Sequence, residues 1–241
     1  SLWRREWSLP DRGPIVSFTF DDFPRSALET GGGILRSYDV CGTYYAAMGL
    51  MGQINERGEH FNERDLRHLL ADGHELGSHT FNHVSCRSTP PEVFDADALK
   101  GREAVISFTG TSRPHEFAYP YGDVTLRAKS RIGSQMNSCR SIIDGVNISP
   151  VDLHLLRANS LYHSAFDLGV IKHLFQVNDQ RRGWLIFYTH DVRDNPSRWG
   201  CKPSQFESVV RLAIQKRAEV LTVGSVLEGL PMNPTANTPE N

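Results

Sequence analysis

The chain has no long apolar run, and its first residues lack the apolar segment of a signal peptide. A helix needs roughly 18 to 20 apolar residues to cross a bilayer, and no stretch approaches that length. The sequence therefore predicts a soluble protein without a membrane span. It favours a cytoplasmic location, with the compartment itself left unknown.

An excess of one charge sign is also missing. The 26 lysines and arginines nearly balance the 28 aspartates and glutamates, which gives a formal net charge of -2. Because nucleic-acid-binding surfaces are strongly basic, nothing here predicts a nucleic-acid partner. The 241 residues suffice for one large domain, which we place at 1–230. Residues 231–241, with three prolines, are predicted to be a mobile tail.

Cysteine is sparse, and its spacing excludes a zinc knot. The four cysteines never form a C-x-x-C pair, and they lie at Cys41, Cys86, Cys139 and Cys201. We predict buried or half-buried thiols, with one or two disulfides as the alternative. The glycine triplet at 31–33 lacks the spacing of a phosphate-binding loop and predicts a turn.

Short apolar runs alternate with helical patterns along the chain, which favours repeated β-α units around a parallel sheet. Strands are expected at 15–20, 42–46, 75–78, 116–119, 135–140, 154–159, 184–189 and 220–222. Helices are expected after the cap Asn62, after a capping box that begins at Ser204, and over 165–177. One closed or nearly closed β/α barrel accommodates this order.

Two adjacent acids, Asp21 and Asp22, follow the first apolar run, and Pro24 follows them. Neighbouring side chains inside a strand point to opposite faces, so both acids converge on one site only at a strand end. Since Pro24 donates no backbone hydrogen bond, the strand is expected to stop about there. Two carboxylates held together repel and need a cation or separate roles.

His79 and His83 follow another predicted strand. Their spacing of four places both imidazoles on one face of a helical turn. Together with Asp22 they form a set of two imidazoles and one carboxylate, which binds zinc or a similar ion and leaves positions open. The alternative is that the acids cap a helix and the histidines are surface groups.

Two further segments lead from a strand to its carboxyl end. Pro120 and Gly122 fix an unusual backbone path, which can turn the Tyr121 amide inward as a donor to an oxyanion. An apolar strand ends at His190, whose imidazole suits proton delivery to a leaving group. In a parallel barrel all four segments lie at the same end.

These segments, in this order, resemble the polysaccharide deacetylase family with NodB homology, carbohydrate esterase family four. Thr19-Phe20-Asp21-Asp22-Phe23-Pro24 resembles the family's T-F-D-D-G-P, and His79-Thr80-Phe81-Asn82-His83 resembles H-[ST]-x-x-H. Ala118-Tyr119-Pro120-Tyr121-Gly122 resembles R-x-P-Y-G, and Thr189-His190 resembles the closing L-x-H. The resemblance implies a distorted (β/α) barrel of seven or eight strands. It makes residues 1–230 a single catalytic domain.

The resemblance also implies roles for individual residues. Asp21 would be the catalytic base and His190 the general acid. Asp22, His79 and His83 would bind one divalent ion, with zinc as the first choice and cobalt, nickel or iron as alternatives. Tyr121, Pro120 and Phe23 would form the oxyanion and substrate-binding region.

Two positions depart from the family pattern. Phe23 replaces a glycine and is expected to place an aromatic ring at the mouth of the site. Ala118 stands where many members have the arginine that orients the base, so we assign that role to Arg157, near another strand end. Asp144 is a candidate for the partner that tunes His190.

The implied activity is metal-dependent removal of N-acetyl groups from the sugars of an oligo- or polysaccharide, with release of acetate. Aromatic side chains that could stack on sugar rings, or simply pack, are Phe23, Phe81, Tyr121 and Trp199. Chitooligosaccharide, poly-N-acetylglucosamine, peptidoglycan and other exopolysaccharides all fit. The alternatives are an O-acetyl esterase, a cyclic-amide hydrolase, or a catalytically impaired glycan-binding module. The sequence leaves the oligomeric state open.

Overall fold

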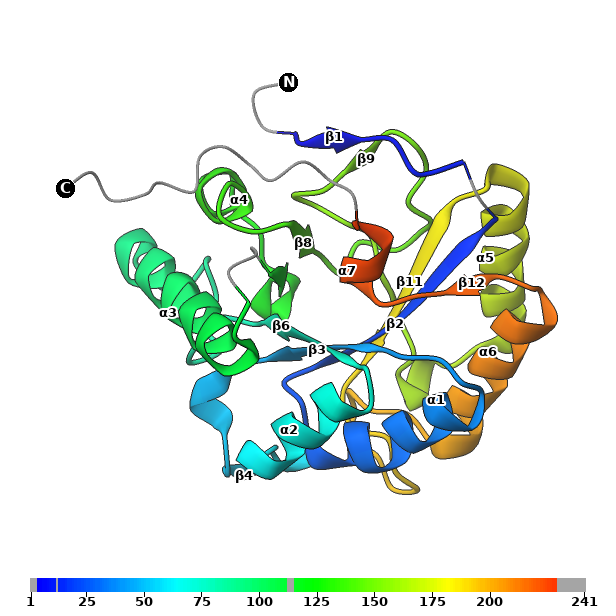
Figure 1. Cartoon of the computed structure of the whole chain (residues 1–241), viewed down its shortest axis with the longest axis horizontal. Coiled ribbons are helices and arrows are strands. Elements are labelled where there is room, and N and C mark those ends of the chain that lie inside the picture. Colours follow the sequence, from blue (N-terminus) through cyan, green and yellow to red (C-terminus); the bar gives the residue numbers. More distant parts are fainter. Residues whose placement is uncertain (1–3, 12, 112–114, 229–241) are drawn as a thin grey trace.

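A curved parallel sheet forms the centre of the computed structural model, which describes residues 4–11, 13–111 and 115–228 (Figure 1). The strand order is β10-β11-β2-β3-β6-β7-β8, and β12 also pairs with β2. The strands are β2 (Ile15–Asp21), β3 (Thr43–Ala46), β6 (Glu75–Ser78), β7 (Glu116–Ala118), β8 (Ser138–Arg140), β10 (Asn159–Ser160), β11 (Trp184–Thr189) and β12 (Glu219–Val220). The predicted barrel of seven or eight parallel strands is confirmed. The predicted tail at 231–241 lies outside the described residues.

The segment 153–160 closes the barrel irregularly. On one side, the Leu156 amide donates to the Cys139 carbonyl of β8 at 2.9 Å. On the other side, Asn159 and Ser160 pair with β11 as β10. The expected strand at 154–159 is therefore reduced to a turn, an isolated bridge at Leu156 and the two-residue strand β10, and this makes the barrel a distorted one.

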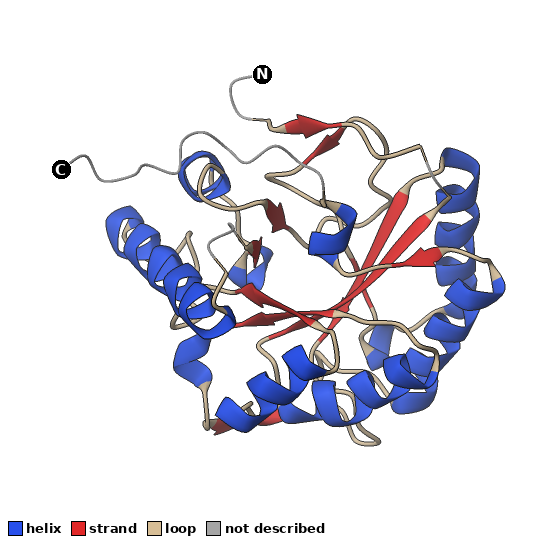
Figure 2. Ribbon diagram, in the orientation of Figure 1, coloured by secondary structure: helices blue, strands red, loops and turns tan. Residues whose placement is uncertain are grey.

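Helices surround the sheet (Figure 2). They are α1 (Gly33–Ser37), α2 (Glu63–Ala71), α3 (Pro91–Thr109), α4 (Leu126–Gly133), α5 (Leu168–Arg181), α6 (Pro203–Gln215) and α7 (Val223–Val226). Two small antiparallel pairs lie apart from the barrel: β1 (Glu6–Trp7) with β9 (Val151–Asp152), and β4 (Ile54–Asn55) with β5 (Gly58–Glu59). None of the helices in the described chain combines the length and apolar character that a bilayer crossing requires.

Side chains along β2 alternate between the two faces of the sheet. Phe18 lies outside the barrel, where its ring contacts Phe206 of α6 with centroids 5.5 Å apart. Ser17 faces the interior and accepts a hydrogen bond from Trp184 Nε1 at 2.9 Å. Asp21 has the same parity as Ser17, so the strand itself directs this acid into the carboxyl end of the barrel.

Some predictions for helix ends, turns and cysteines are confirmed by the structure, and others are wrong. Asn62 caps α2, because its Oδ1 accepts from the Asp65 amide at 3.1 Å. The capping box predicted at Ser204 is wrong: α6 begins at Pro203, and the Gln205 side chain accepts a hydrogen bond from the Lys202 amide at 3.0 Å. The turn predicted for 31–33 is wrong, since these glycines lie in a π-helical segment and in α1. All four cysteines are free thiols, as predicted.

A pair of acids lies at the opposite, amino end of the barrel. Glu75 begins β6 and accepts hydrogen bonds from Thr43 Oγ1 at 2.6 Å and the Gly224 amide at 3.1 Å. Glu116 begins β7, is 3% exposed, and accepts from Asn137 Nδ2 at 3.4 Å. Burial, and then the charge of Glu75, raise the pKa of Glu116 well above its ordinary value.

We expect Glu116→Gln to stabilise the protein at alkaline pH. Glu116 holds its proton more tightly in the folded chain than in the unfolded chain, so the free energy of unfolding falls as pH rises from the ordinary pKa through the raised one. Glutamine removes this loss. Each unit of pKa is worth about 1.4 kcal/mol, and 1 kcal/mol shifts Tm by about 2–4 °C for a domain of this size. Thermal unfolding at pH 5, 7 and 9 should show a gain of a few degrees that grows with pH. Glu103→Gln, on the exposed side of α3, is the control, and an identical pH profile for both variants would contradict the prediction.

Candidate active site

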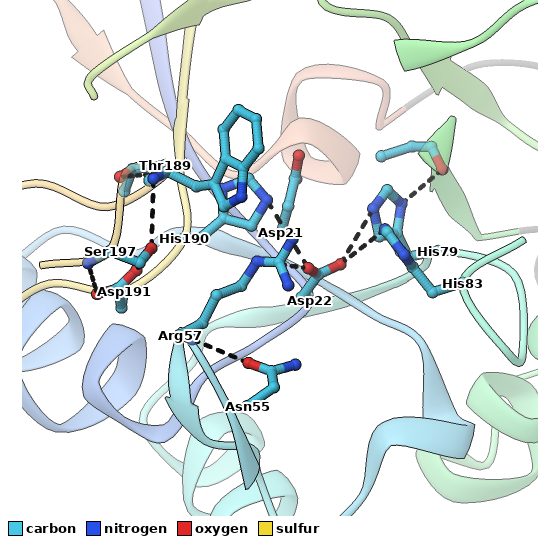
Figure 3. A network of polar contacts seen from close by, with 12 residues as sticks. Asp21, Asp22, Asn55, Arg57, His79, His83, Thr189, His190, Asp191 and Ser197 are labelled. Atoms are coloured by element: carbon cyan, nitrogen blue, oxygen red, sulfur yellow. Dashed lines mark hydrogen bonds and ion pairs between the residues drawn. The ribbon is translucent and has the colours of Figure 1, made fainter. Parts of the chain in front are cut away.

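The acid pair marks the point where β2 ends and the backbone changes direction. Asp21 is the last residue of β2, while Asp22 and Phe23 have left-handed φ values of 61° and 54°. This turn brings Asp22 beside Asp21 instead of onto the opposite face of the sheet, and Figure 3 shows both carboxylates in one site. His60 supports the turn, since its Nδ1 lies 3.0 Å from the Asp22 carbonyl oxygen.

Asp21 is held by an arginine from across the barrel. Arg140 ends β8, is fully buried, and its Nη2 lies 2.6 Å from both carboxylate oxygens of Asp21. The assignment of this role to Arg157 is wrong. The Arg157 side chain is exposed and donates to the Asp144 carbonyl at 2.7 Å, away from Asp21.

Asp22 meets the two predicted histidines. Its Oδ1 lies 3.4 Å from His79 Nε2 and 3.0 Å from His83 Nε2, and one ligand atom from each residue lies within 4.8 Å of the others. His79 Nδ1 lies 2.8 Å from the Ala118 carbonyl, so this nitrogen carries the hydrogen and Nε2 presents a lone pair. Ala118 thus contributes to the site through its backbone.

This donor set fits a divalent cation. Asp22 is fully buried, and neither of its carboxylate oxygens has a donor in hydrogen-bond geometry within the described part of the chain. Burial opposes its charge, but His83, His190 and His79 together hold the pKa of this carboxyl well below its ordinary value. Burial also lowers the pKa of His79 to about 4, so its imidazole is neutral, as metal binding requires.

The expected helical turn between His79 and His83 is wrong. His79 follows β6 directly, and left-handed residues at Thr80 and His83, with φ of 59° and 56°, bring the two rings to a centroid distance of 4.9 Å. The Thr80 hydroxyl accepts from the Val84 amide at 3.2 Å and stabilises this loop.

His190 approaches Asp22 from the end of β11. Its Nε2 lies 3.8 Å from Asp22 Oδ2, and its Nδ1 lies 3.3 Å from the Trp199 carbonyl. Burial lowers the pKa of His190 below its ordinary value, and the charges of Asp22 and Asp21 oppose this only in part. The Asp144 side chain is exposed and no contact joins it to His190, so Trp199 is the observed partner.

Tyr121 and Phe23 differ in exposure: the first lies at the surface and the second in the core. Pro120 begins a short turn in which Tyr121 is left-handed with φ of 60°, and its ring lies 4.5 Å from His83 while 60% exposed. Phe23, in contrast, is fully buried against Phe61, with ring centroids 4.9 Å apart. The prediction of Phe23 at the substrate mouth is therefore wrong: its side chain belongs to the core, which stabilises the left-handed turn.

A cavity of about 400 Å³ opens over this cluster. Most of its lining is acidic, basic or aromatic. The lining residues are Asp21, Glu56, Arg57, His79, His83, Tyr121, Gly122, Ile142, Tyr162, Tyr188, His190, Arg198 and Trp199. Of the predicted aromatic side chains, Trp199 and Tyr121 lie here, whereas Phe23 and Phe81 do not line it.

Sequence reasoning missed three residues of the site. The sequence did contain a signal for Arg140, because this residue ends the strand predicted at 135–140 and so lies at a strand end, where the other site residues were sought. Arg57 comes from the small β4–β5 hairpin, and its Nε lies 3.1 Å from Asp22 Oδ2. Neither Arg57 nor His60 follows a strand of the barrel, so strand-end reasoning could not find them.

Known proteins share both sequence and fold with this chain. The family model for polysaccharide deacetylase matches residues 9–137. The peptidoglycan-N-acetylglucosamine deacetylase of Bacillus cereus is 28% identical over 98 residues, which span 40% of this chain and 42% of that protein. The matched part is thus less than half of this relative.

Two solved structures show the fold. The Xyl-CE4 domain of a multidomain xylanase, from the hindgut metagenome of Trinervitermes trinervoides, aligns with a TM-score of 0.60 and 16% identity over 92% of this chain and 94% of its own. A CE4 family pseudoenzyme from Bacillus anthracis aligns with a TM-score of 0.55 and 14% identity over 90% of this chain and 66% of its own. Since the family model covers more than half of the sequence, this chain belongs to the polysaccharide deacetylase family.

Proposed function

We propose that this protein removes N-acetyl groups from the sugars of an oligo- or polysaccharide and releases acetate, with one divalent ion bound by Asp22, His79 and His83. One observation carries the proposal: the three ligand atoms converge within 4.8 Å, next to the separate, arginine-held carboxylate of Asp21. Residues 1–230 form one catalytic domain, because β2 and β12, from opposite ends of the described chain, pair in one sheet.

The bound ion would supply Lewis-acid chemistry, polarising the acetyl carbonyl and making a water easier to deprotonate. Zinc is the first choice for two imidazoles and a carboxylate, and cobalt, nickel and iron accept the same donors. The fully buried Asp22 favours a cation here, since among the described residues Arg57 is the one arginine or lysine that pairs with it.

Asp21 acts as the base. Its carboxylate lines the cavity, and Arg140 restrains it in one orientation. As the water oxygen attacks the acetyl carbon, Asp21 accepts the water proton. Arg140 thus orients the base but does not touch the substrate.

His190 acts as the acid. Its Nδ1 hydrogen faces the Trp199 carbonyl, so Nε2 is the nitrogen that faces the cavity and carries the transferable proton. When the C–N bond breaks, His190 gives this proton to the departing sugar amine, because an amine leaves poorly as an anion. The Tyr121 amide, at the edge of the same cavity, donates to the carbonyl oxygen as negative charge develops on it.

Chelation should abolish acetate release, and adding back zinc, cobalt, nickel or iron should restore it. His79→Ala should lose bound metal and activity together, because it removes one of three ligands. His68→Ala, on the exposed part of α2, is the matched control and should keep both. Full activity of the metal-free protein would contradict the proposal.

A substrate panel tests the reaction itself. Acetate release from N-acetylated oligosaccharides, and not from O-acetylated glycans, is the expected result. Preference for the O-acetylated set would favour an esterase, and ring opening without acetate would favour a cyclic-amide hydrolase. Saccharide binding without any turnover in the metal-loaded protein would indicate an impaired binding module.

A further inference from the structure

The β4–β5 hairpin places a positive charge in the active-site cavity that no step of the proposed hydrolysis uses. Its tip residues are Glu56 and Arg57. The Asn55 side chain accepts from the Arg57 amide at 2.9 Å, which fixes the tip. The loop after β11 holds the hairpin over the site: Arg193 Nη2 donates to the Glu56 carbonyl at 2.8 Å, and Trp199 Nε1 lies 3.4 Å from Glu56 Oε1.

Arg57 approaches the Asp22 oxygen that His79 and His83 do not contact. Its Nε lies 3.1 Å from Asp22 Oδ2, whereas His79 and His83 contact Oδ1 (Figure 3). Asp22 can therefore bind a cation through Oδ1 while Arg57 keeps its place. The guanidinium lines the cavity, its side chain is 15% exposed, and no acceptor for its terminal nitrogens occurs among the described residues.

The charges that line the cavity balance before a metal ion binds. Arg140 pairs with Asp21, and Arg57 pairs with Asp22. The positive charge of Arg198 equals the negative charge of Glu56, without a direct contact being implied. A divalent ion then adds two positive charges with no acid left to offset them. In a cavity of this kind the unbalanced charge favours an anionic ligand over a neutral one.

Arginine is suited to a carboxylate in particular. Its planar guanidinium presents several donors in a fixed fork, and the contact of Nε with Asp22 leaves the terminal amino groups to bind an anion. Arg198 lies at the rim of the same cavity, stacked on the Trp199 ring with 4.2 Å between its Cζ and the ring centroid. A sugar carboxylate that enters the cavity thus meets two cationic groups beside an aromatic surface.

We propose that the substrate is an acidic saccharide with a carboxylate next to the acetylated position, and that Arg57 binds this carboxylate. The inference rests on the proposed function and narrows it to a substrate class. Arg57 is a specificity residue: it distinguishes acidic from neutral N-acetylated saccharides and takes no part in bond breaking.

The test compares two acidic oligosaccharides with their neutral methyl esters. One probe carries the carboxylate on a uronic acid next to N-acetylglucosamine, and the other carries it on an ether-linked arm of the acetylated sugar. In metal-saturated protein, Arg57→Gln should raise KM for the preferred acidic probe by about tenfold more than it raises KM for the methyl ester. Arg57→Lys should recover part of the loss, and Arg67→Gln, on exposed α2, should change neither.

Two results would overturn the inference. The first is an equal loss on acidic and neutral probes, accompanied by a lower metal content of Arg57→Gln, which would show that Arg57 supports Asp22 alone. The second is a wild-type protein that does not favour either acidic probe over its ester. Calorimetric binding of the acidic probes to the metal-loaded protein separates this inference from the proposed function: binding that depends on Arg57 supports the acidic subsite even if no acetate is released.

Discussion

Asp21→Asn should lower the turnover number for acetate release by about 10³-fold and leave the bound metal in place. General-base catalysis contributes about 10²- to 10⁴-fold, and an amide cannot accept the water proton. The asparagine oxygen still accepts from Arg140, and the proposed metal ligands Asp22, His79 and His83 are unchanged. Single-turnover kinetics and metal analysis of the same preparation measure the two properties together.

The neighbouring acid provides the matched control. Asp22→Asn makes the same chemical change one residue along the chain, but it removes a proposed metal ligand and should lose the ion as well as the activity. The two variants therefore separate the roles of the acid pair. Full activity of Asp21→Asn, or loss of metal from it, would show that the roles are assigned wrongly.

Strand-end reasoning predicted most of the site because it depends on topology alone. In a parallel barrel every strand delivers its last residue to the same end, so Asp21, His79 and His190 could be grouped without knowledge of the tertiary contacts. The structure brings these residues together around Asp22. The same argument applies to Arg140, which ends its own strand.

Arg157 shows where this reasoning fails. The segment 153–160 is not a regular strand, since only its final two residues pair as β10. A shift of one residue along a strand moves a side chain to the opposite face. Counting residues therefore cannot predict on which face a side chain of an irregular segment lies. Here the Arg157 amide donates to Asn147 Oδ1 at 2.8 Å, and the side chain lies on the outside.

Left-handed backbone conformation is the other feature of the site that could not be predicted from the sequence. Five residues other than glycine adopt it around the site: Asp22, Phe23, Thr80, His83 and Tyr121. Such conformations are disfavoured for bulky residues and persist only where packing enforces them. At Phe23 the enforcing contacts are with Phe61 and Tyr44, whose ring centroids lie 4.9 and 5.0 Å away. These contacts join residues distant in sequence, so the motif alone suggested an exposed ring.

The second large effect is expected at Arg140. Arg140→Met leaves the carboxylate of Asp21, 4% exposed, without its cationic partner. Breaking one side of a buried ion pair costs about 3–5 kcal/mol of unfolding free energy, and the freed Asp21 also loses its orientation as a base. Denaturant unfolding and kcat measure the two losses. Arg157→Met, at an exposed arginine, should change the unfolding free energy by less than about 0.5 kcal/mol.

The double variant Asp21→Asn/Arg140→Met separates stability from catalysis. With both charges removed, no uncompensated ion is buried, and the unfolding free energy should return toward the wild-type value, since a buried pair is often replaced by neutral groups without loss. Activity should not return, because the base is absent. A double variant whose two stability losses simply add would contradict a direct Asp21–Arg140 interaction. Recovery of stability without activity would show that the two buried charges are not needed for folding and that the carboxylate of Asp21 is needed for turnover.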